Sequence, residues 1–284
     1  DLDGAERATL RGHTDQVTSL VYSQDGKEIV TAARDGTIRR WSTDGSALAV
    51  IRGPRYRPLT AWIQPGGDRL LVTWIPPRPV QYVTGVGASL LSREGKELAE
   101  LGTKVRATRF SPDGTRIVTG SYDGVIGIWD SDGKQLTTWQ GHALSVLGCS
   151  FAPDGQSILT CSDDGTARVW DLTGRQLAVL RAHSGSVLGA AFDRSGERIV
   201  TGGVDMTARL WDRTGRLLAT LRHEGNIARA AFAPDGRTIL TASVDGAARL
   251  WPVDTDVLLR IATSRATRAL TPEERERYVD LLGE

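Results

Sequence analysis

The stretch "TCSDDGTARVWD", residues 160–171, decides the fold, because the chain contains five versions of it. Read alone, the string suggests a reactive site, since an acidic pair, a threonine and a cysteine lie close together. Nearly the same string returns as "TAARDGTIRRWS" (31–42), "TGSYDGVIGIWD" (119–130), "TGGVDMTARLWD" (201–212) and "TASVDGAARLWP" (241–252). The stretch is therefore one copy of a repeat.

The tryptophan near the end of each copy gives the period of this repeat. The tryptophans from Trp129 to Trp251 follow one another after 41, 41 and 40 residues, and the 88 residues from Trp41 to Trp129 leave room for two copies. The chain thus holds six repeat units. A period of about 40 to 45 residues with four short strands per unit is typical of propeller blades, which need neighbours to cover their faces.

Alternation and turn residues place the strands within a unit. In the fourth unit, strands are predicted at 145–151, 157–161, 166–170 and 176–180. The connectors "APDGQ", "SDDG" and "DLTGR" contain Gly and Asp, which tolerate the backbone conformations of tight hairpins. Each unit is therefore predicted to be an antiparallel four-stranded sheet, and the chain an all-β propeller.

A polar pattern accompanies the repeat. Each of the four histidines stands 22 residues before the turn aspartate of its copy, a threonine stands four residues before that aspartate, and a tryptophan six after it. The pattern closely resembles the WD40 repeat family over residues 1–251, and this resemblance implies a buried hydrogen-bond chain within each blade. A buried aspartate needs donors, which the histidine ring supplies, and a threonine hydroxyl can relay to the indole N–H. The predicted structural sets are His13, Thr31, Asp35 and Trp41; His142, Thr160, Asp164 and Trp170; His183, Thr201, Asp205 and Trp211; and His223, Thr241, Asp245 and Trp251.

Two units depart from the pattern. The third keeps Thr119, Asp123 and Trp129 but has Leu101 at the histidine position, so its network must lose a member or recruit water. The second has Pro54, Val72 and Leu91 at the histidine, threonine and tryptophan positions. It also has nine extra residues between the last two, including "IPPRPVQYVTG", whose prolines cannot join a central ladder. A loop protruding around residues 75–86 is predicted, either as drift in a weak blade or for binding.

The two ends of the repeat array fit each other. Residues 1–13 match residues 171–183, so the chain starts with a fourth strand, whereas the unit ending at Trp251 has only three. We therefore predict a propeller over 1–252 in which residues 1–11 supply the closing strand of the last blade, since a closed ring leaves no open edge. Six blades are detected, or seven if a blade is missing at the N-terminus.

Residues 253–284 are predicted to form a short helical tail. Apolar residues from Val257 follow helical spacing, and residues 271–274 form a capping box with a proline at the first helical position. The tail, especially "LTPEER", is similar to the ends of bacterial WD40 proteins in which the propeller follows a signalling domain. Because the chain also begins with Asp1, we expect a piece of a longer bacterial signalling or defence protein.

Composition limits the classes of partner. The net charge is +1 with 24% charged residues, which argues against a generally basic nucleic-acid binder. There is no apolar run of about 18 residues that could span a membrane and no secretion signal. Cys149 and Cys161 are predicted to lie diagonally on adjacent strands, where a bridge is conceivable, although buried thiols in a reducing cytoplasm are favoured.

No motif in the sequence indicates catalysis, and neither a cofactor nor a metal site is predicted. There is no nucleophile elbow, no phosphate-binding P-loop and no H-E-x-x-H. "GVGASL" at 85–90 opens no helix, and "DSDG" at 130–133 lacks the later acidic ligand of a calcium loop. The favoured interpretation is a non-catalytic module for sensing or scaffolding. The alternative is a propeller-type hydrolase with a carboxylate site in its central channel.

The loops that enter each blade, and those that join its second and third strands, form the expected binding face. In units four to six these loops are nearly uncharged, whereas in units one to three they are basic and aromatic, with only Asp15 opposing. Arg and Tyr are enriched at binding hot spots, so an acidic protein segment or another anionic ligand is the expected partner. The candidate partner-binding residues are Arg34, Arg55, Tyr56, Arg57, Lys104, Arg106 and Tyr122.

Overall fold

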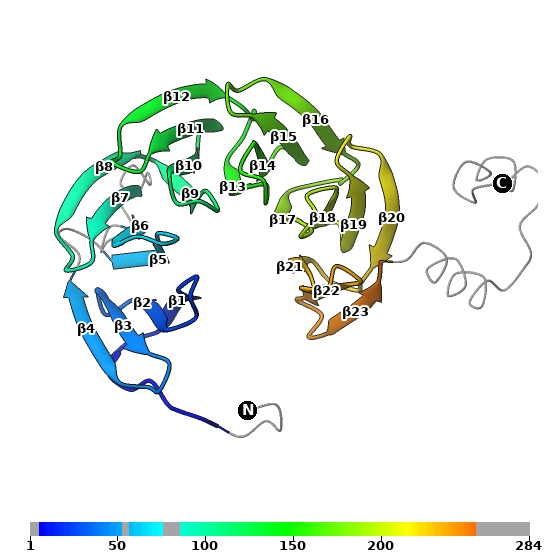
Figure 1. Ribbon diagram of the computed structural model, residues 1–284. Coiled ribbons are helices and arrows are strands. Elements are labelled where there is room, and N and C mark those ends of the chain that lie inside the picture. The colour runs from blue at the N-terminus through cyan, green and yellow to red at the C-terminus, as the bar shows by residue number, and fades with distance from the viewer. Residues whose placement is uncertain (1–5, 53–56, 76–85, 254–284) are drawn as a thin grey trace, which may run out of the picture.

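The computed structural model describes residues 6–52, 57–75 and 86–253. These residues form six antiparallel sheets arranged side by side in an arc around a common centre (Figure 1). The first five sheets have four strands and the sixth has three. The prediction of an all-β propeller is confirmed, and we number the sheets one to six in chain order.

Every strand is about six residues long, which suits a narrow blade. In the fourth sheet, the observed strands differ from the predicted ranges by at most one residue at either end. The strands are, sheet by sheet, β1 (Val17–Tyr22), β2 (Glu28–Ala33), β3 (Thr37–Ser42) and β4 (Ala47–Arg52); β5 (Arg57–Ile63), β6 (Arg69–Ile75), β7 (Gly87–Ser92) and β8 (Glu97–Thr103); β9 (Val105–Phe110), β10 (Arg116–Ser121), β11 (Val125–Asp130) and β12 (Gln135–Gln140); β13 (Val146–Phe151), β14 (Ser157–Ser162), β15 (Thr166–Asp171) and β16 (Gln176–Arg181); β17 (Val187–Phe192), β18 (Arg198–Gly203), β19 (Thr207–Asp212) and β20 (Leu217–Arg222); and β21 (Ile227–Phe232), β22 (Thr238–Ser243) and β23 (Ala248–Pro252).

The core lies between the sheets. In each sheet the first strand is nearest the centre of the arc and the fourth, where present, is outermost (Figure 1). Apolar side chains on the middle strands of one sheet pack against the next sheet, as Val200 and Leu210 of the fifth sheet pack with Ile227 and Ile239 of the sixth. Each sheet is thus stabilised by burial against the sheets beside it, of which the first and sixth have one each.

The turn between the second and third strands needs a left-handed residue. Gly165 occupies this position in the fourth sheet with φ of 80°, which glycine adopts without steric cost. In the fifth sheet, Met206 takes the same position with φ of 62°. A side chain in this region costs about 1–2 kcal/mol per residue, so this turn is strained relative to its counterparts.

The ring is not closed in this structure, which differs from the sequence prediction. The sixth sheet has no fourth strand, and residues 6–12 form no strand, so the predicted pairing between residues 6–10 and this sheet is not formed. A gap separates the first and sixth sheets (Figure 1). The N-terminal segment lies beside the first sheet, where Ala8 and Leu10 lie against the position that a Cβ on Gly45 would take.

This contact is the one that an outer strand makes elsewhere in the ring. Gly133 of the third sheet faces Ala99 and Leu101 of β8 in the same way, so residues 6–11 hold the place of a preceding blade's fourth strand. Closure of the ring by this segment stays a prediction.

Two predicted segments lie partly outside the residues that the structure describes. The loop predicted around 75–86 falls between Ile75, the end of β6, and Gly87, the start of β7. Of the predicted helical tail at 253–284, only Val253 is described. In the described ranges, no helix is long and apolar enough to cross a membrane.

Candidate functional site

A buried hydrogen-bond relay runs through the fourth sheet. His142, in the loop before β13, contacts Asp164 through Nδ1 at 2.9 Å and Thr160 through Nε2 at 2.7 Å. The indole N–H of Trp170 donates to the same threonine hydroxyl at 2.9 Å. The relay ties the entering loop to β14 and β15, and all four side chains are used in holding one another.

The same relay occurs in three other sheets. The distance from the histidine Nε2 to the threonine hydroxyl is 2.7 Å in each, and the tryptophan N–H lies 2.8 to 2.9 Å from that hydroxyl. The histidine Nδ1 lies 2.9 to 3.2 Å from the aspartate. These sets are His13, Thr31, Asp35 and Trp41; His183, Thr201, Asp205 and Trp211; and His223, Thr241, Asp245 and Trp251.

A further member of the relay was missed in the sequence. Thr166, two residues after the turn aspartate, donates from its hydroxyl to Asp164 at 2.6 Å, and Thr37 and Thr207 do the same for Asp35 and Asp205. The signal was the recurring threonine after the turn, visible in three of the five strings. This second hydroxyl helps to keep the carboxylate charged.

The titration behaviour of the relay argues for a static role. Although burial raises it, hydrogen bonds from His183 and Thr207 lower the pKa of Asp205 to about 2. Burial lowers the pKa of His142 in spite of the neighbouring Asp164 carboxylate. At neutral pH these aspartates are charged, and with both ring nitrogens engaged the histidines have no free position for a substrate.

The third sheet keeps half of the relay. Trp129 still donates to Thr119 at 3.0 Å, and Leu101 is fully buried at the histidine position. Freed from a histidine, Asp123 accepts hydrogen bonds from Ser121 and, at 3.4 Å, from the ammonium of Lys104. The network therefore loses a member, and its aspartate turns to the surface.

The second sheet replaces the relay with apolar contacts. Val72 and Leu91, at the threonine and tryptophan positions, are both fully buried. Removing both partners of a hydrogen bond leaves no unsatisfied group, so this exchange need not destabilise the blade. Pro54, at the histidine position, lies outside the described residues.

The structure brings three of the predicted binding residues together on the third sheet. The Arg106 guanidinium lies 5.2 Å from the centre of the Tyr122 ring, and the Tyr122 backbone N–H donates to the Lys104 carbonyl at 2.9 Å. Lys104 itself is a non-glycine residue with φ of 65°. Strained residues of this kind persist where the surroundings hold them and are frequent at binding sites.

The remaining predicted binding residues are on neighbouring sheets or are not described. Arg34 is exposed in the turn after β2, and Arg57 is exposed at the start of β5. Because both positions are at the end of the sheets where the loops enter, they face the same way as Lys104. Arg55 and Tyr56 lie outside the described residues.

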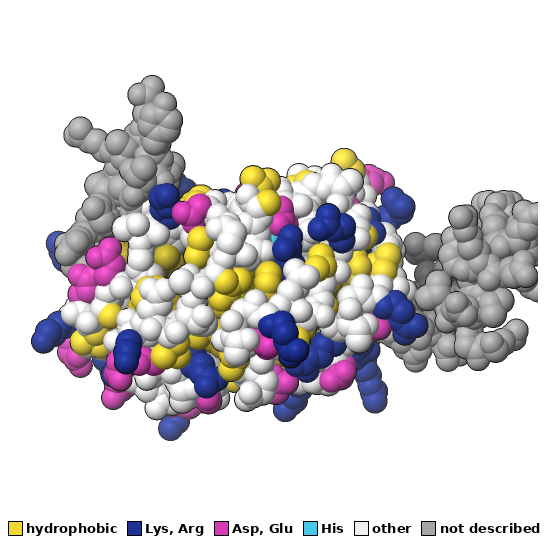
Figure 2. All heavy atoms as spheres, turned by 90° about the horizontal axis from the view of Figure 1, so that it is seen from above, with side chains coloured by type: hydrophobic (Ala, Val, Ile, Leu, Met, Phe, Trp, Pro, Cys, Tyr) yellow, Lys and Arg dark blue, Asp and Glu magenta, His cyan; other side chains and the backbone are white. Residues whose placement is uncertain are grey.

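The rim of the arc differs from this loop face. Figure 2 shows basic and acidic side chains interspersed at the rim, with hydrophobic side chains across its middle. The hydrophobic positions include a half-exposed leucine in each of the outer strands β4, β8, β12 and β16, namely Leu48, Leu98, Leu136 and Leu177. The one-sided basic charge is therefore a property of the loop face and not of the whole surface.

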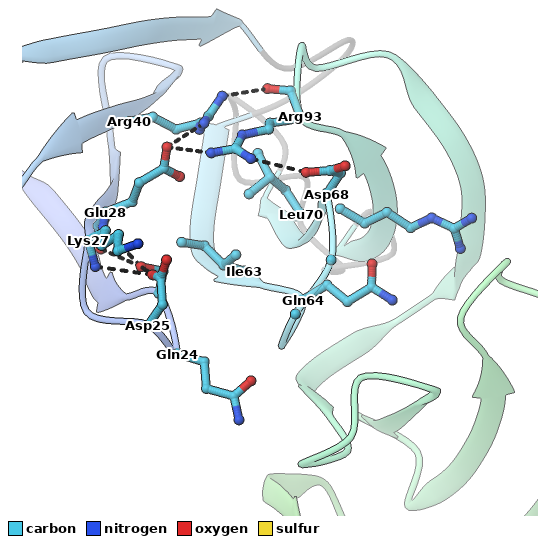
Figure 3. Close-up of a pocket in the computed structure, with 14 residues that line it drawn as sticks. Gln24, Asp25, Lys27, Glu28, Arg40, Ile63, Gln64, Asp68, Leu70 and Arg93 are labelled. Carbon is cyan, nitrogen blue, oxygen red and sulfur yellow. Dashed lines mark hydrogen bonds and ion pairs between the residues drawn. The ribbon is translucent and has the colours of Figure 1, made fainter.

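A cavity of about 540 Å³ lies at the opposite end of the first two sheets, lined by the β1–β2 and β5–β6 connections. Arg40 and Arg93 converge on Glu28, and Arg93 also reaches Asp68 at 3.0 Å (Figure 3). Although burial raises it, hydrogen bonds from the two arginines lower the pKa of Glu28. The sequence did not predict this cluster. Its residues come from two different sheets, and they do not recur at equivalent positions of the other repeat units.

The two cysteines are free thiols. Cys149 is opposite Thr160, and Cys161 is opposite Gly148, which is the diagonal arrangement that the sequence predicted. Burial raises the pKa of both thiols to about 12, so they are poor nucleophiles at neutral pH. In the described part of the chain, no group of three or more His, Cys, Asp or Glu side chains is placed to hold a metal ion.

Comparison with known proteins gives a family match. The family model described as "WD domain, G-beta repeat" matches residues 4–42, 95–130, 133–171, 174–212 and 215–252, together more than half of the chain. Most of the second sheet, which lacks the relay, falls outside these ranges.

The chain matches less than half of the length of the similar curated proteins. It is 30% identical over 143 residues to pre-mRNA-processing factor 19 of Bos taurus, covering 48% of the chain and 27% of that protein. It is 28% identical over 159 residues to guanine nucleotide-binding protein subunit beta-1 of Drosophila melanogaster, covering 51% of the chain and 42% of that protein. The crystal structure of the computationally designed Ika8 protein is similar with a TM-score of 0.73 and 25% identity, covering 88% of this chain and 75% of that one.

Proposed function

The chain belongs to the WD40 repeat family, and we propose that it acts as a non-catalytic module that binds a protein partner. The observation that carries this proposal is the uneven charge of the loop face. On the first three sheets this face has Arg34, Arg57, Lys104 and Arg106 with Tyr122, whereas the corresponding loops of the last three sheets expose apolar side chains such as Leu144 and Val244. A face on which basic side chains predominate favours an acidic partner.

The proposed partner is an acidic protein segment that lies across the first three sheets. Arg and Tyr side chains combine charge with stacking surface, which suits them to binding hot spots. Lys104 has one carboxylate partner, Asp123, and both side chains are about half exposed, so water screens this pair. The ammonium can therefore turn to an incoming carboxylate at little cost.

The alternative of a hydrolase with a carboxylate site in the channel has less support. The strands nearest the centre, β1, β5, β9, β13, β17 and β21, contain no Asp or Glu. The relay aspartates are held by histidine and threonine side chains within the sheets. Neither arrangement offers the pair of accessible carboxylates that such hydrolysis requires.

The wider setting is also a proposal. We propose that the module is the sensing or scaffolding part of a larger bacterial signalling or defence protein in the cytoplasm. The support is the similarity of the C-terminal "LTPEER" segment to the ends of such proteins, together with two free thiols, the buried Cys161 and the partly buried Cys149, of the kind that persist in reducing compartments.

Fluorescence anisotropy with a labelled peptide rich in Asp and Glu tests the proposed binding. We expect saturable binding that weakens as salt rises, because opposite surface charges steer the encounter. The double variant Arg57→Glu, Lys104→Glu should abolish binding while circular dichroism stays unchanged.

The matched control is Ser186→Glu with Asn226→Glu, which places the same two new carboxylates on the loops of the fifth and sixth sheets. This control should bind nearly as well as the parent chain. Equal losses from both pairs would contradict the assignment to the first three sheets.

A further inference from the structure

The only charged residues on the innermost strands of the described sheets, which form the inner wall of the ring, are basic. The six innermost strands contain four charged residues, all arginine: Arg57, Arg106, Arg109 and Arg229. The chain as a whole has 35 basic and 34 acidic residues, so the wall departs from the composition of the molecule. Among the described residues, none of these four arginines forms an ion pair with a carboxylate. The innermost strands therefore carry positive charge that no carboxylate on these strands compensates.

Arg109, on β9, is held in place without a polar partner. Its guanidinium carbon lies 3.2 Å from the centre of the Trp62 ring, which comes from β5 of the neighbouring sheet. The Nη1 atom is buried and has no hydrogen-bond partner within the described part of the chain. A buried donor without an acceptor is costly, and an anion bound beside it removes that cost. The stacking on Trp62 fixes the orientation of the fork before any ligand arrives.

Other arginines lie near the same region of the wall. Burial, together with the positive charge of Arg229 on β21, lowers the pKa of Arg109 to about 10, so the side chain stays cationic at neutral pH. The positive charges of Arg229 and Arg106 both lower the pKa of the Cys161 thiol, although its burial raises it. Arg109 on β9 and Arg229 on β21 belong to innermost strands on opposite sides of the centre of the arc (Figure 1).

One carboxylate is close to this region. Asp163, in the turn between β14 and β15, raises the pKa of the Cys161 thiol, whereas the arginines lower it. It forms no ion pair with an arginine in the described residues. It is thus a local source of repulsion for an anion at the wall.

We infer that the inner wall binds a small phosphate-bearing anion between Arg109 and Arg229, with Arg106 adding charge nearby. Guanidinium forks match the oxygen geometry of phosphate, and several arginines without carboxylates favour a multiply charged ligand over a single carboxylate. Arg109 and Arg229 are not part of the loop face proposed to bind an acidic segment. The site shares only Arg106 with that face and would accept its ligand from the centre of the ring.

The other charged or apolar sites of the described structure have protein partners or another structural explanation, so they do not indicate a ligand. The arginines in the cavity between the first two sheets are already paired with Glu28 and Asp68. The exposed apolar faces of the first and sixth sheets are the faces that closure of the ring would cover.

Isothermal titration calorimetry with inorganic tripolyphosphate tests the inference. We expect the parent chain to bind the probe, and Arg109→Gln and Arg229→Gln each to weaken binding by about tenfold or more, because each removes a charged hydrogen-bond donor. Asp163→Asn should strengthen binding, because it removes the opposing carboxylate. The matched control is Arg52→Gln, which removes the same charge from the exposed end of β4 and should leave the affinity within about twofold of the parent value.

A melting curve separates binding from folding. Since the Nη1 atom of Arg109 is buried without a partner, Arg109→Gln should melt at the same or a higher temperature than the parent chain while losing affinity for the probe. The inference is overturned if the parent chain does not bind tripolyphosphate, or if Arg52→Gln weakens binding as much as Arg109→Gln. Failure of the peptide to bind would leave this result untouched and would count only against the loop-face proposal.

Discussion

The fourth and sixth sheets contain the same hydrogen-bonded relay but differ in what covers them. In the fourth sheet the paired residues Leu159 and Val169 are 1% and 0% exposed, whereas their counterparts in the sixth, Leu240 and Leu250, are 45% and 70% exposed. The relay of the sixth sheet is nevertheless complete, with Trp251 donating to its threonine at 2.8 Å. The relay therefore organises a sheet from within, while burial of the sheet's faces depends on its neighbours.

The largest expected effect comes from removing the relay tryptophan in the covered sheet. Trp170→Ala should cost about 3–5 kcal/mol, because a fully buried ring leaves a cavity that its neighbours cannot fill. Trp251→Ala should cost about 1–3 kcal/mol, because Trp251 is only partly buried and its sheet has one open face. Urea unfolding followed by fluorescence measures both values.

The same pair of variants decides whether the repeated stretch is scaffold. If it is, any loss of partner binding in Trp170→Ala follows the fraction of unfolded chain. Loss of binding in a fully folded variant would make residues 160–171 a binding site instead.

The next effect concerns the open face of the sixth sheet. We predict that deleting residues 1–11 lowers the melting temperature and promotes aggregation, because closure by this segment would give β23 a partner and cover the apolar faces at both ends of the arc. On the first sheet, that face includes Val17, Leu20 and Tyr22, all close to half exposed. Size-exclusion chromatography and thermal melting give the readout. An unchanged melting temperature with monomeric elution would show that the segment does not close the ring.

Most of the fold could be predicted because it depends on local, repeated signals. Strand ranges and relays follow from turn residues and fixed spacings, such as the 22 residues from His142 to Asp164. The cluster around Glu28 could not be predicted, since Arg93 reaches it from another sheet through a contact that does not recur. Closure depends on how far the stacked sheets curve, and this curvature is set by packing between sheets and not by any single repeat.

For the candidate binding residues, the sequence predicted which sheet and which end they occupy but not which side chains contact one another. Alignment of the repeats places Lys104, Arg106 and Tyr122 at the loop end of the third sheet. Their contacts arise because Leu101 replaces a histidine and leaves Asp123 free to pair with Lys104. The sequence showed the missing histidine, but the direction in which the aspartate turns depends on the side chains around it.

A smaller effect on the free energy of unfolding is expected at low pH. It should arise in the sheets that contain a relay and not in those without one. The pKa of Asp205 is depressed in the folded state to about 2, below its ordinary value of about 4. Its contribution to stability is therefore fully present above about pH 4 and is lost as the pH falls toward 2. Urea midpoints measured between these pH values should fall for the parent chain and fall less steeply for Asp205→Asn. Parallel curves would show that this aspartate is not linked to folding.

The smallest expected effect lies in the turn of the fifth sheet, which sits between the two compared sheets. Gly165 and Gly246 have φ of 80° and 84° in the fourth and sixth sheets, while Met206 takes the equivalent conformation at 62°. Met206→Gly should stabilise the protein by about 0.5–1 kcal/mol, because relief of the left-handed strain outweighs the added freedom of glycine in the unfolded chain. The reverse variant, Gly165→Met, should destabilise it by about 1–2 kcal/mol, because the new side chain must adopt the left-handed backbone conformation that glycine takes there. Urea midpoints compare the two variants, and a loss of stability in Met206→Gly would show that the methionine side chain contributes more to this turn than its backbone conformation costs.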